Sequence, residues 1–248
     1  MSEPTIKVSG LSIGWDQTIL QRDASFEIER GSIFVILGGS GCGKSTMLRY
    51  LVGLETPLAG SISVDGRAPS DGVAGPPPFG VMFQSGALLG SLSVGENVAL
   101  PLQEWTDLPL DAIGGIVEAK LRMVGLSRAE DQMPSELSGG MKKRAAIARA
   151  MALEPELIFL DEPSAGLDPV SAAELDDLIL NLNEHLGLTF VVVTHDLESI
   201  FKISTTCIML DRESKSIIAR GDPRVLRDTS EDPRVHSFFN RAPQVVKA

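Results

Sequence analysis

The sequence is poor in cysteine, aromatic residues and basic charge. Its 248 residues contain two cysteines, Cys42 and Cys207, which lie too far apart to form a CxxC pair. Their number excludes a disulfide framework and favours a reduced, cytosolic setting. Only 5% of the residues are aromatic, and the three histidines are scattered, so no zinc signature exists.

Basic residues are outnumbered by acidic ones, 22 against 33, and the formal net charge is -11. Since nucleic acids and anionic membrane surfaces attract basic patches, this balance argues against a nucleic-acid partner and a polybasic membrane anchor. The apolar runs are short, as in Ile33–Leu37, and none could span a bilayer. Residues 1–7 are polar and lack the apolar core of a secretory signal. We therefore expect a soluble chain that a partner would hold at any membrane.

The order of the expected elements predicts an α/β fold. Apolar, β-branched runs typical of strands buried on both faces occur at Ser32–Leu37, Leu157–Leu160 and Thr189–Val193. Helical spacing of apolar residues predicts helices at Thr46–Val52 and Ala172–Leu186. Such alternation of strands and helices predicts a mostly parallel core sheet.

Two regions differ from this core. Short β-like segments precede it, at Ile6–Leu11, Ala24–Glu29 and Ser61–Asp65, and predict an N-terminal antiparallel β subdomain. The middle of the chain reads instead as helices and loops, with helices at Asp111–Val124 and Gly139–Met151. We expect one domain (1–248), divided into a core (1–87 and 152–228), a helical subdomain (88–151) and a C-terminal tail (229–248). The proline-rich stretch 72–80 predicts a surface loop.

A phosphate-binding motif follows the first buried strand. The segment GGSGCGKST matches the pattern G-x-x-x-x-G-K-[ST], and a helix is expected to follow it. Glycines let the backbone wrap around phosphate oxygens, Lys44 would reach the β- and γ-phosphates, and Ser45 would ligate Mg²⁺. A glycine-rich turn would match by chance in roughly one chain in a hundred. We therefore predict an ATP-binding loop of Gly38, Gly39, Ser40, Gly41, Cys42, Gly43, Lys44, Ser45 and Thr46.

An acidic pair ends another predicted strand. In the segment ELIFLDE, four apolar residues lead into Asp161 and Glu162. Asp161 could hold the Mg²⁺ hydration shell, and Glu162 could polarise an attacking water molecule. The alternative is a strand that ends in a polar turn. In a chain with a phosphate loop, the acidic pair favours nucleotide chemistry.

Four other features have both a functional and a structural interpretation. Ser138 and two glycines open a helix, either as a second anion site or as an ordinary serine cap. His195 follows a predicted strand and could meet a γ-phosphate, or it could be a surface histidine. Gln84 also follows a strand-like run, but its position alone indicates no function. Trp15 could stack on a base or serve in packing.

Taken together, these motifs resemble those of ABC-transporter ATPase subunits over nearly the whole chain. The order is the phosphate loop, Gln84, LSGGM, ELIFLDE, SAGLD and His195. The resemblance implies an ABC-type P-loop NTPase that forms a head-to-tail homodimer, with each ATP held between one phosphate loop and the partner's LSGGM segment. The implied contacts to the partner's ATP are Ser138, Gly139, Gly140 and Met141. The implied dimer-interface loop consists of Ser164, Ala165, Gly166, Leu167 and Asp168.

The same resemblance assigns catalytic roles. It makes Glu162 the general base and His195 the γ-phosphate switch, and Lys44 would stabilise the developing charge. Trp15 would stack on the base, and Gln84 would relay the nucleotide state to the helical subdomain. The implied Mg²⁺ ligands are Ser45, Gln84 and Asp161.

A closer resemblance is to the ATPases of the MCE-type (Mla) lipid transport group. It rests on the segments 83–102, 134–163 and 231–239 and on Met141. It implies phospholipid transport between inner and outer membranes, at the cytoplasmic face of the inner membrane. The implied partners are a polytopic permease, an MCE-domain protein and sometimes a STAS-domain subunit. An ABC transporter ATPase for another small substrate, and a soluble single-cassette assembly ATPase, remain alternatives.

Overall fold

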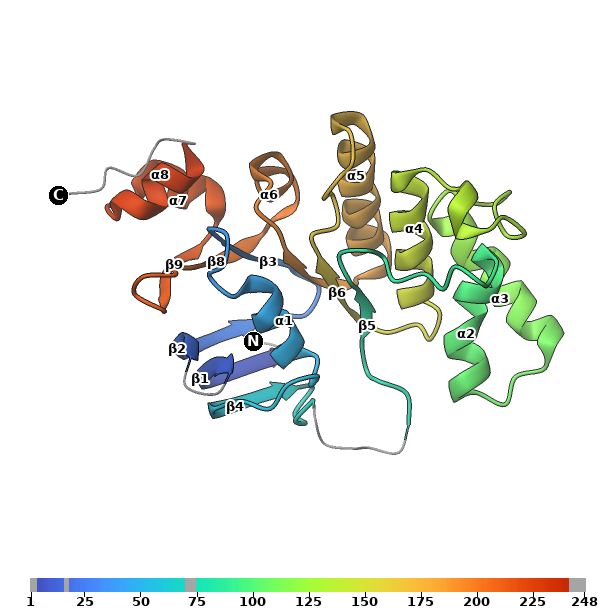
Figure 1. Ribbon diagram of the computed structural model, residues 1–248, viewed down its shortest axis with the longest axis horizontal. Helices are drawn as coiled ribbons and strands as arrows, with labels where there is room; N and C mark the ends of the chain where they lie inside the picture. The colour runs from blue at the N-terminus through green and yellow to red at the C-terminus, as the bar shows by residue number, and fades with distance from the viewer. Residues whose placement is uncertain (1–3, 16–17, 70–74, 241–248) are drawn as a thin grey trace. The chain divides into compact units, whose positions relative to one another are not determined.

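The computed structural model describes residues 4–15, 18–69 and 75–240 (Figure 1). The chain forms two compact units, which are Met1–Gly72 with Val191–Ala248, and Val73–Phe190. The chain returns from the second unit to the first within strand β7 (Thr189–Val193). The predicted boundaries between core, helical subdomain and tail, at 87/88, 151/152 and 228/229, differ from the boundaries between these two units. The predicted division stays a prediction.

The first unit contains an antiparallel sheet of three strands. Its members, in the order β2-β1-β4, are β2 (Thr18–Ile28), β1 (Ile6–Trp15) and β4 (Ala59–Val64). Alternate residues of β1 are buried, which is the period-2 pattern of a strand with one covered face. At Gly60 the backbone approaches β1 so closely that a Cβ atom would lie 2.3 Å from the carbonyl oxygen of Gly10. The predicted N-terminal antiparallel sheet is confirmed.

The rest of the first unit surrounds a fully buried strand, β3 (Ile33–Gly38). β3 pairs in parallel with β8 (Thr206–Leu210), and β8 pairs in antiparallel with β9 (Ile217–Gly221). The helices of this unit are α1 (Lys44–Leu51), α6 (Leu197–Ile203), α7 (Pro223–Thr229) and α8 (Pro233–Phe239). Each of the last three begins with an aspartate cap, because a carboxylate satisfies backbone N–H groups at a helix start.

The second unit combines two parallel strands with a group of helices. The strands are β5 (Gly80–Met82) and β6 (Leu157–Asp161). The helices are α2 (Val94–Trp105), α3 (Leu110–Met123), α4 (Gly139–Ala150) and α5 (Pro169–Leu186), with a 3₁₀ turn at Pro134–Glu136. α2, α3 and α4 pack against one another (Figure 1). The predicted helical insert is confirmed, and so is a mixed α/β fold with parallel pairing.

Several elements had no clear signal in the sequence. β8 and β9 are short, and β9 is only half-buried, so neither shows a long apolar run. Of the predicted loop 72–80, residues 72–74 lie outside the described part of the chain. Residues 75–79 form bends and irregular backbone, and Gly80 already belongs to β5. Of the predicted tail, residues 241–248 also lie outside it. None of the helices within 4–15, 18–69 and 75–240 is long and apolar enough to cross a membrane.

Candidate functional site

The predicted phosphate loop connects β3 to α1 and is shaped by its backbone. Gly38, Gly41 and Gly43 have φ angles of 145, 74 and 99°, which glycine adopts more readily than other residues. A Cβ atom on Gly38 would lie 2.3 Å from the carbonyl oxygen of Leu210, at the end of β8. The loop is therefore packed against its neighbouring strand, with no room for a larger residue at position 38.

The start of α1 suits an anion. No side chain caps it, and its first turn contains no acidic residue. The buried Lys44 lies at the first helical position, and its Nζ donates hydrogen bonds to the carbonyl oxygens of Gly38 (2.9 Å) and Gly39 (3.2 Å). A helix N-terminus and an ammonium group together place positive charge at this loop. The residues present thus fit a phosphate group.

Cys42 contributes to the loop through its backbone. Its side chain is buried, and burial raises the pKa of the thiol, so the protonated form is favoured. Its carbonyl oxygen accepts a hydrogen bond of 2.8 Å from Nε2 of Gln21, a fully buried residue of β2. The same Nε2 donates to the carbonyl oxygen of Asp211 at 2.9 Å. Gln21 therefore braces the phosphate loop, a role that no sequence motif indicated.

Two other predicted residues lie in the first unit. Trp15 ends β1, and its side chain is 49% exposed. This exposure does not fit a core packing role and leaves the indole available to a ligand. His195 lies between β7 and α6 and is also exposed. Both positions agree with a surface that meets a nucleotide.

The acidic pair lies at the end of β6 in the second unit. Asp161 and Glu162 are both buried, with exposed fractions of 7% and 8%. Glu162 has a φ of 47°, in the left-handed region that non-glycine residues rarely adopt. Such conformations persist where the surrounding structure holds them, and they gather at functional sites. A strand that ends in a polar turn is thus an adequate description of the backbone here. It does not explain why Asp161 and Glu162 are both buried.

Helix α4 connects the Glu162 turn to the segment that contains Gln84. Nζ of Lys143 donates a hydrogen bond to the carbonyl oxygen of Gln84 and another, of 3.3 Å, to that of Glu162. Arg149 donates to the carbonyl oxygens of Gly86 (2.9 Å) and Ala87 (2.7 Å). Gln84 itself is exposed. No motif in the sequence indicated these contacts.

The LSGGM segment opens α4 beside the SAGLD segment. Oγ of Ser138 accepts a hydrogen bond of 3.3 Å from the backbone N–H of Met141, so Ser138 is a helix cap. A Cβ atom on Gly139 would lie 3.1 Å from a methyl group of Leu167. The structure thus brings these two predicted interface segments together. Asp168, the last residue of SAGLD, caps α5.

A cavity of about 240 Å³ adjoins the start of α4. Its lining residues include Ser138, Gly140, Met141 and Arg144 of the signature region and Ser171 of α5. Ser138 and Gly139 are exposed. Small residues and the half-buried Arg144 therefore border an accessible space. The start of α4 can thus accept an anion there, in addition to being capped by Ser138.

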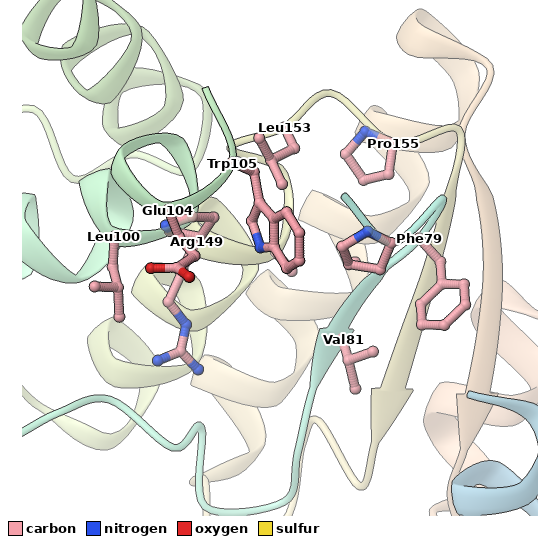
Figure 2. Close-up of a pocket in the computed structure, with 12 residues that line it drawn as sticks. Phe79, Val81, Leu100, Glu104, Trp105, Arg149, Leu153 and Pro155 are labelled. Atoms are coloured by element: carbon pink, nitrogen blue, oxygen red, sulfur yellow. The ribbon is translucent and has the colours of Figure 1, made fainter. Parts of the chain in front are cut away.

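A larger and more apolar pocket lies between β5, α2 and the end of α4 (Figure 2). Its volume is about 370 Å³, and its walls include Phe79, Leu100, Trp105 and Leu153. The indole of Trp105 is 46% exposed. Arg149, which holds the segment after Gln84, also lines this pocket. No sequence motif indicates this pocket, because its residues come from three separate segments of the chain.

The phosphate loop and the buried acidic strand end, on an α/β scaffold, define an ATP-binding cassette of the P-loop type. The chain belongs to the ABC transporter family, whose model matches residues 21–165. It is an ATP-binding ATPase of this family. Cassettes with the same fold include cbiO1 of Clostridium perfringens, part of the ABC transporter complex cbiONQ, with a TM-score of 0.82, 28% identity and 95% of each chain covered. Another is a dimeric cassette in a post-hydrolysis state bound to ADP and Pi, with a TM-score of 0.77, 29% identity, and 88% of this chain and 98% of that chain covered.

Curated relatives cover most of the chain. The intermembrane phospholipid transport system ATP-binding protein MlaF of Escherichia coli is 43% identical over 221 residues, which are 87% of this chain and 81% of that protein. MlaF of Haemophilus influenzae is 39% identical over 244 residues, 96% and 91% of the two chains. The probable ribonucleotide transport ATP-binding protein mkl of Mycobacterium tuberculosis is 40% identical over 241 residues, which are 95% of this chain and 66% of that protein. This chain thus spans slightly less than two thirds of the mycobacterial protein.

Proposed function

We propose that this chain is the ATPase subunit of a system that moves phospholipid between the inner and outer membranes. The observation that carries the proposal is its similarity to two phospholipid transport ATP-binding proteins, at 39% and 43% identity over most of both chains. The closer resemblance in segments 83–102, 134–163 and 231–239 supports the same group. ATP hydrolysis would supply the work of transport.

The proposed assembly contains two copies of this chain, a polytopic permease and an MCE-domain lipid-binding protein, with a STAS-domain subunit in some systems. The permease would hold the chain at the cytoplasmic face of the inner membrane. We propose the apolar pocket near Trp105 as the place where a cytoplasmic helix of the permease docks (Figure 2). Its apolar walls suit a helix, and Arg149 connects it to the segment after Gln84.

The proposed phosphate site is the loop from Gly38 to Thr46. Its backbone N–H groups and the ammonium of Lys44 would bind the phosphates, and Trp15 would stack on the base. Ser45, Gln84 and Asp161 would hold Mg²⁺, which neutralises phosphate charge when bound. His195 would contact the γ-phosphate.

Glu162 is the proposed general base. Its carboxylate would take a proton from the attacking water, and its buried position excludes bulk solvent. The signature residues Ser138–Met141 would contact the ATP of the partner copy, and residues 164–168 would line the dimer interface. The contact between Gly139 and Leu167 supports a joint surface of these two segments.

The test is affinity purification of the tagged chain from its own detergent-solubilised membranes, with mass spectrometry of proteins and lipids. We expect a polytopic permease, an MCE-domain protein and phospholipid. A permease with a solute-binding protein would contradict the lipid substrate and leave the ATPase in place. Purely soluble partners would contradict transport itself.

A second candidate substrate is a ribonucleotide, because the mycobacterial relative is described as a probable ribonucleotide transport protein. Reconstitution of the purified assembly in liposomes separates the two candidates. Phospholipid transport predicts ATP-dependent transfer of a fluorescent phospholipid to an MCE-domain acceptor. Ribonucleotide transport predicts ATP-dependent movement of a labelled ribonucleotide across the liposome membrane.

A further inference from the structure

Lys143 joins the ends of two neighbouring strands. Its side chain reaches from α4, and its Nζ donates hydrogen bonds to the carbonyl oxygens of Gln84 and Glu162. Gln84 follows β5, and Glu162 follows β6, which pairs with β5 in parallel. One ammonium group therefore holds the two segments that leave the same edge of this strand pair.

The environment of Lys143 is unusual for a lysine. The residue is only 7% exposed, and burial lowers the pKa of its ammonium below the ordinary value, although the charges of Asp161 and Glu162 act in the opposite direction. Burying a charged amine is costly unless it is hydrogen-bonded and near opposite charge, and both conditions are met here. A long side chain is thus kept in one place, where it acts as a fixed connection.

The Glu162 backbone needs support from its surroundings. A non-glycine residue with a φ of 47° is in a strained conformation, so the surrounding contacts must hold it. The hydrogen bond from Lys143 is received by the carbonyl of this same residue. Arg149, the other basic tether of α4, donates to Gly86 and Ala87 instead. Lys143 therefore differs from Arg149 in holding the acidic turn as well as the Gln84 segment.

We propose that Lys143 is a positioning residue for ATP hydrolysis, which orients the Glu162 turn and couples it to Gln84 and to the helix that begins with LSGGM. The inference rests on the proposed role of Glu162 as general base. Lys143 itself touches neither substrate nor metal in this proposal. Its loss should lower the rate of the chemical step and leave nucleotide binding in place.

The test compares Lys143→Met and Lys143→Arg with Lys120→Met in the full-length chain. Lys120 is a matched control, because it is a buried lysine of the same unit (6% exposed) whose ammonium pairs with Glu154 at 3.1 Å. Lys143→Met should lower kcat for ATP by about 10- to 100-fold, since it removes a charged donor from two carbonyl groups. The Kd of a fluorescent ATP analogue should change by less than about threefold. Lys143→Arg should recover part of kcat, and Lys120→Met should keep it.

Wild-type kcat in Lys143→Met would overturn the proposal. A fall in kcat that is fully explained by a smaller folded fraction, measured by circular dichroism, would also overturn it. If Lys143→Met does not fold, Lys143→Gln keeps one amide donor and should give a folded chain of intermediate kcat; a wild-type rate in that variant would overturn the proposal equally.

A double-mutant cycle distinguishes failure of this inference from failure of the proposed base. In a Glu162→Gln background, Lys143→Met should cause little further loss, because a positioning residue acts through the group it positions. Two independent, multiplying losses would overturn the inference. Brisk hydrolysis by Glu162→Gln alone would instead remove Glu162 from its proposed role.

Discussion

The phosphate loop and the Glu162 turn are both predicted to take part in ATP hydrolysis, but they are built differently. The phosphate loop takes its shape from glycines and from close backbone contact with β8. The Glu162 turn contains no glycine at its strained position and is held by Lys143 of α4. The phosphate loop is thus shaped mainly by its backbone, and the Glu162 turn is held by a side chain from another helix.

This difference has a mechanical consequence. A backbone-built loop can change shape only if its own residues rearrange, so it suits a constant task such as holding phosphate. A turn held through a tether changes its position when the tethering helix moves. Because α4 begins with LSGGM and ends at the apolar pocket, movement at either end could reach Glu162 through Lys143.

The largest expected effect comes from the acidic turn itself. Glu162→Gln keeps the size of the side chain and removes the proposed base. We expect hydrolysis to fall by about 10²- to 10⁴-fold, while ATP binding is retained. Phosphate release and nucleotide titration measure the two properties separately. Loss of both together would mean that Glu162 shapes the binding site rather than the chemistry.

The next effect should come from the phosphate loop, and it should appear in stability. Gly38→Ala places a Cβ atom 2.3 Å from the carbonyl oxygen of Leu210, at a φ of 145°. We expect a loss of about 2–4 kcal/mol in the free energy of unfolding without nucleotide, measured by urea titration. Gly39→Ala is the matched control, because a Cβ atom there meets nothing within 4 Å. Equal stability of the two variants would show that this loop is not fixed by its backbone.

The contrast also explains which features could be predicted from the sequence. Apolar runs are local, so β3 and β6 were predicted with nearly correct bounds. α4 was predicted at Gly139–Met151 and lies at Gly139–Ala150. Local patterns of this kind reflect the backbone geometry that each segment needs.

The side-chain connections were not predictable in the same way. Gln21 and Lys143 each join segments that are far apart in sequence, and neither belongs to a recognisable pattern. A buried glutamine in a strand and a lysine in a basic helix both resemble ordinary surface residues until the fold is known. The roles of the motif residues themselves remain predictions that the proposed variants test.

Gln21 offers a way to sharpen the comparison, because its side chain reaches the phosphate loop from another strand. Gln21→Leu removes both hydrogen bonds of Nε2 and leaves the carbonyl groups of Cys42 and Asp211 without this donor. We expect a loss of about 1–2 kcal/mol in unfolding free energy, less than for Gly38→Ala. The exposed Gln103 of α2 provides the control Gln103→Leu, which should stay near the wild-type value. A larger loss of unfolding free energy in Gln21→Leu than in Gly38→Ala would show that the Gln21 side chain stabilises the loop more than its backbone packing does.

The smallest effect concerns Asp211, whose backbone carbonyl accepts from Gln21. Burial raises the pKa of its carboxyl group, but hydrogen bonds from Ser214 and the charge of Arg234 outweigh burial, so the pKa lies below its ordinary value. A carboxyl group with a lowered pKa in the folded state stabilises the protein above its ordinary pKa, near 4, and this stability is lost as the pH falls through the folded value. Arg234→Gln should therefore lower the free energy of unfolding, measured by urea titration at pH 7, by less than about 1 kcal/mol. The difference from wild type should shrink below pH 4. A difference that stays constant with pH would show that Arg234 acts through packing of α8, and that the loop's support does not depend on this charge.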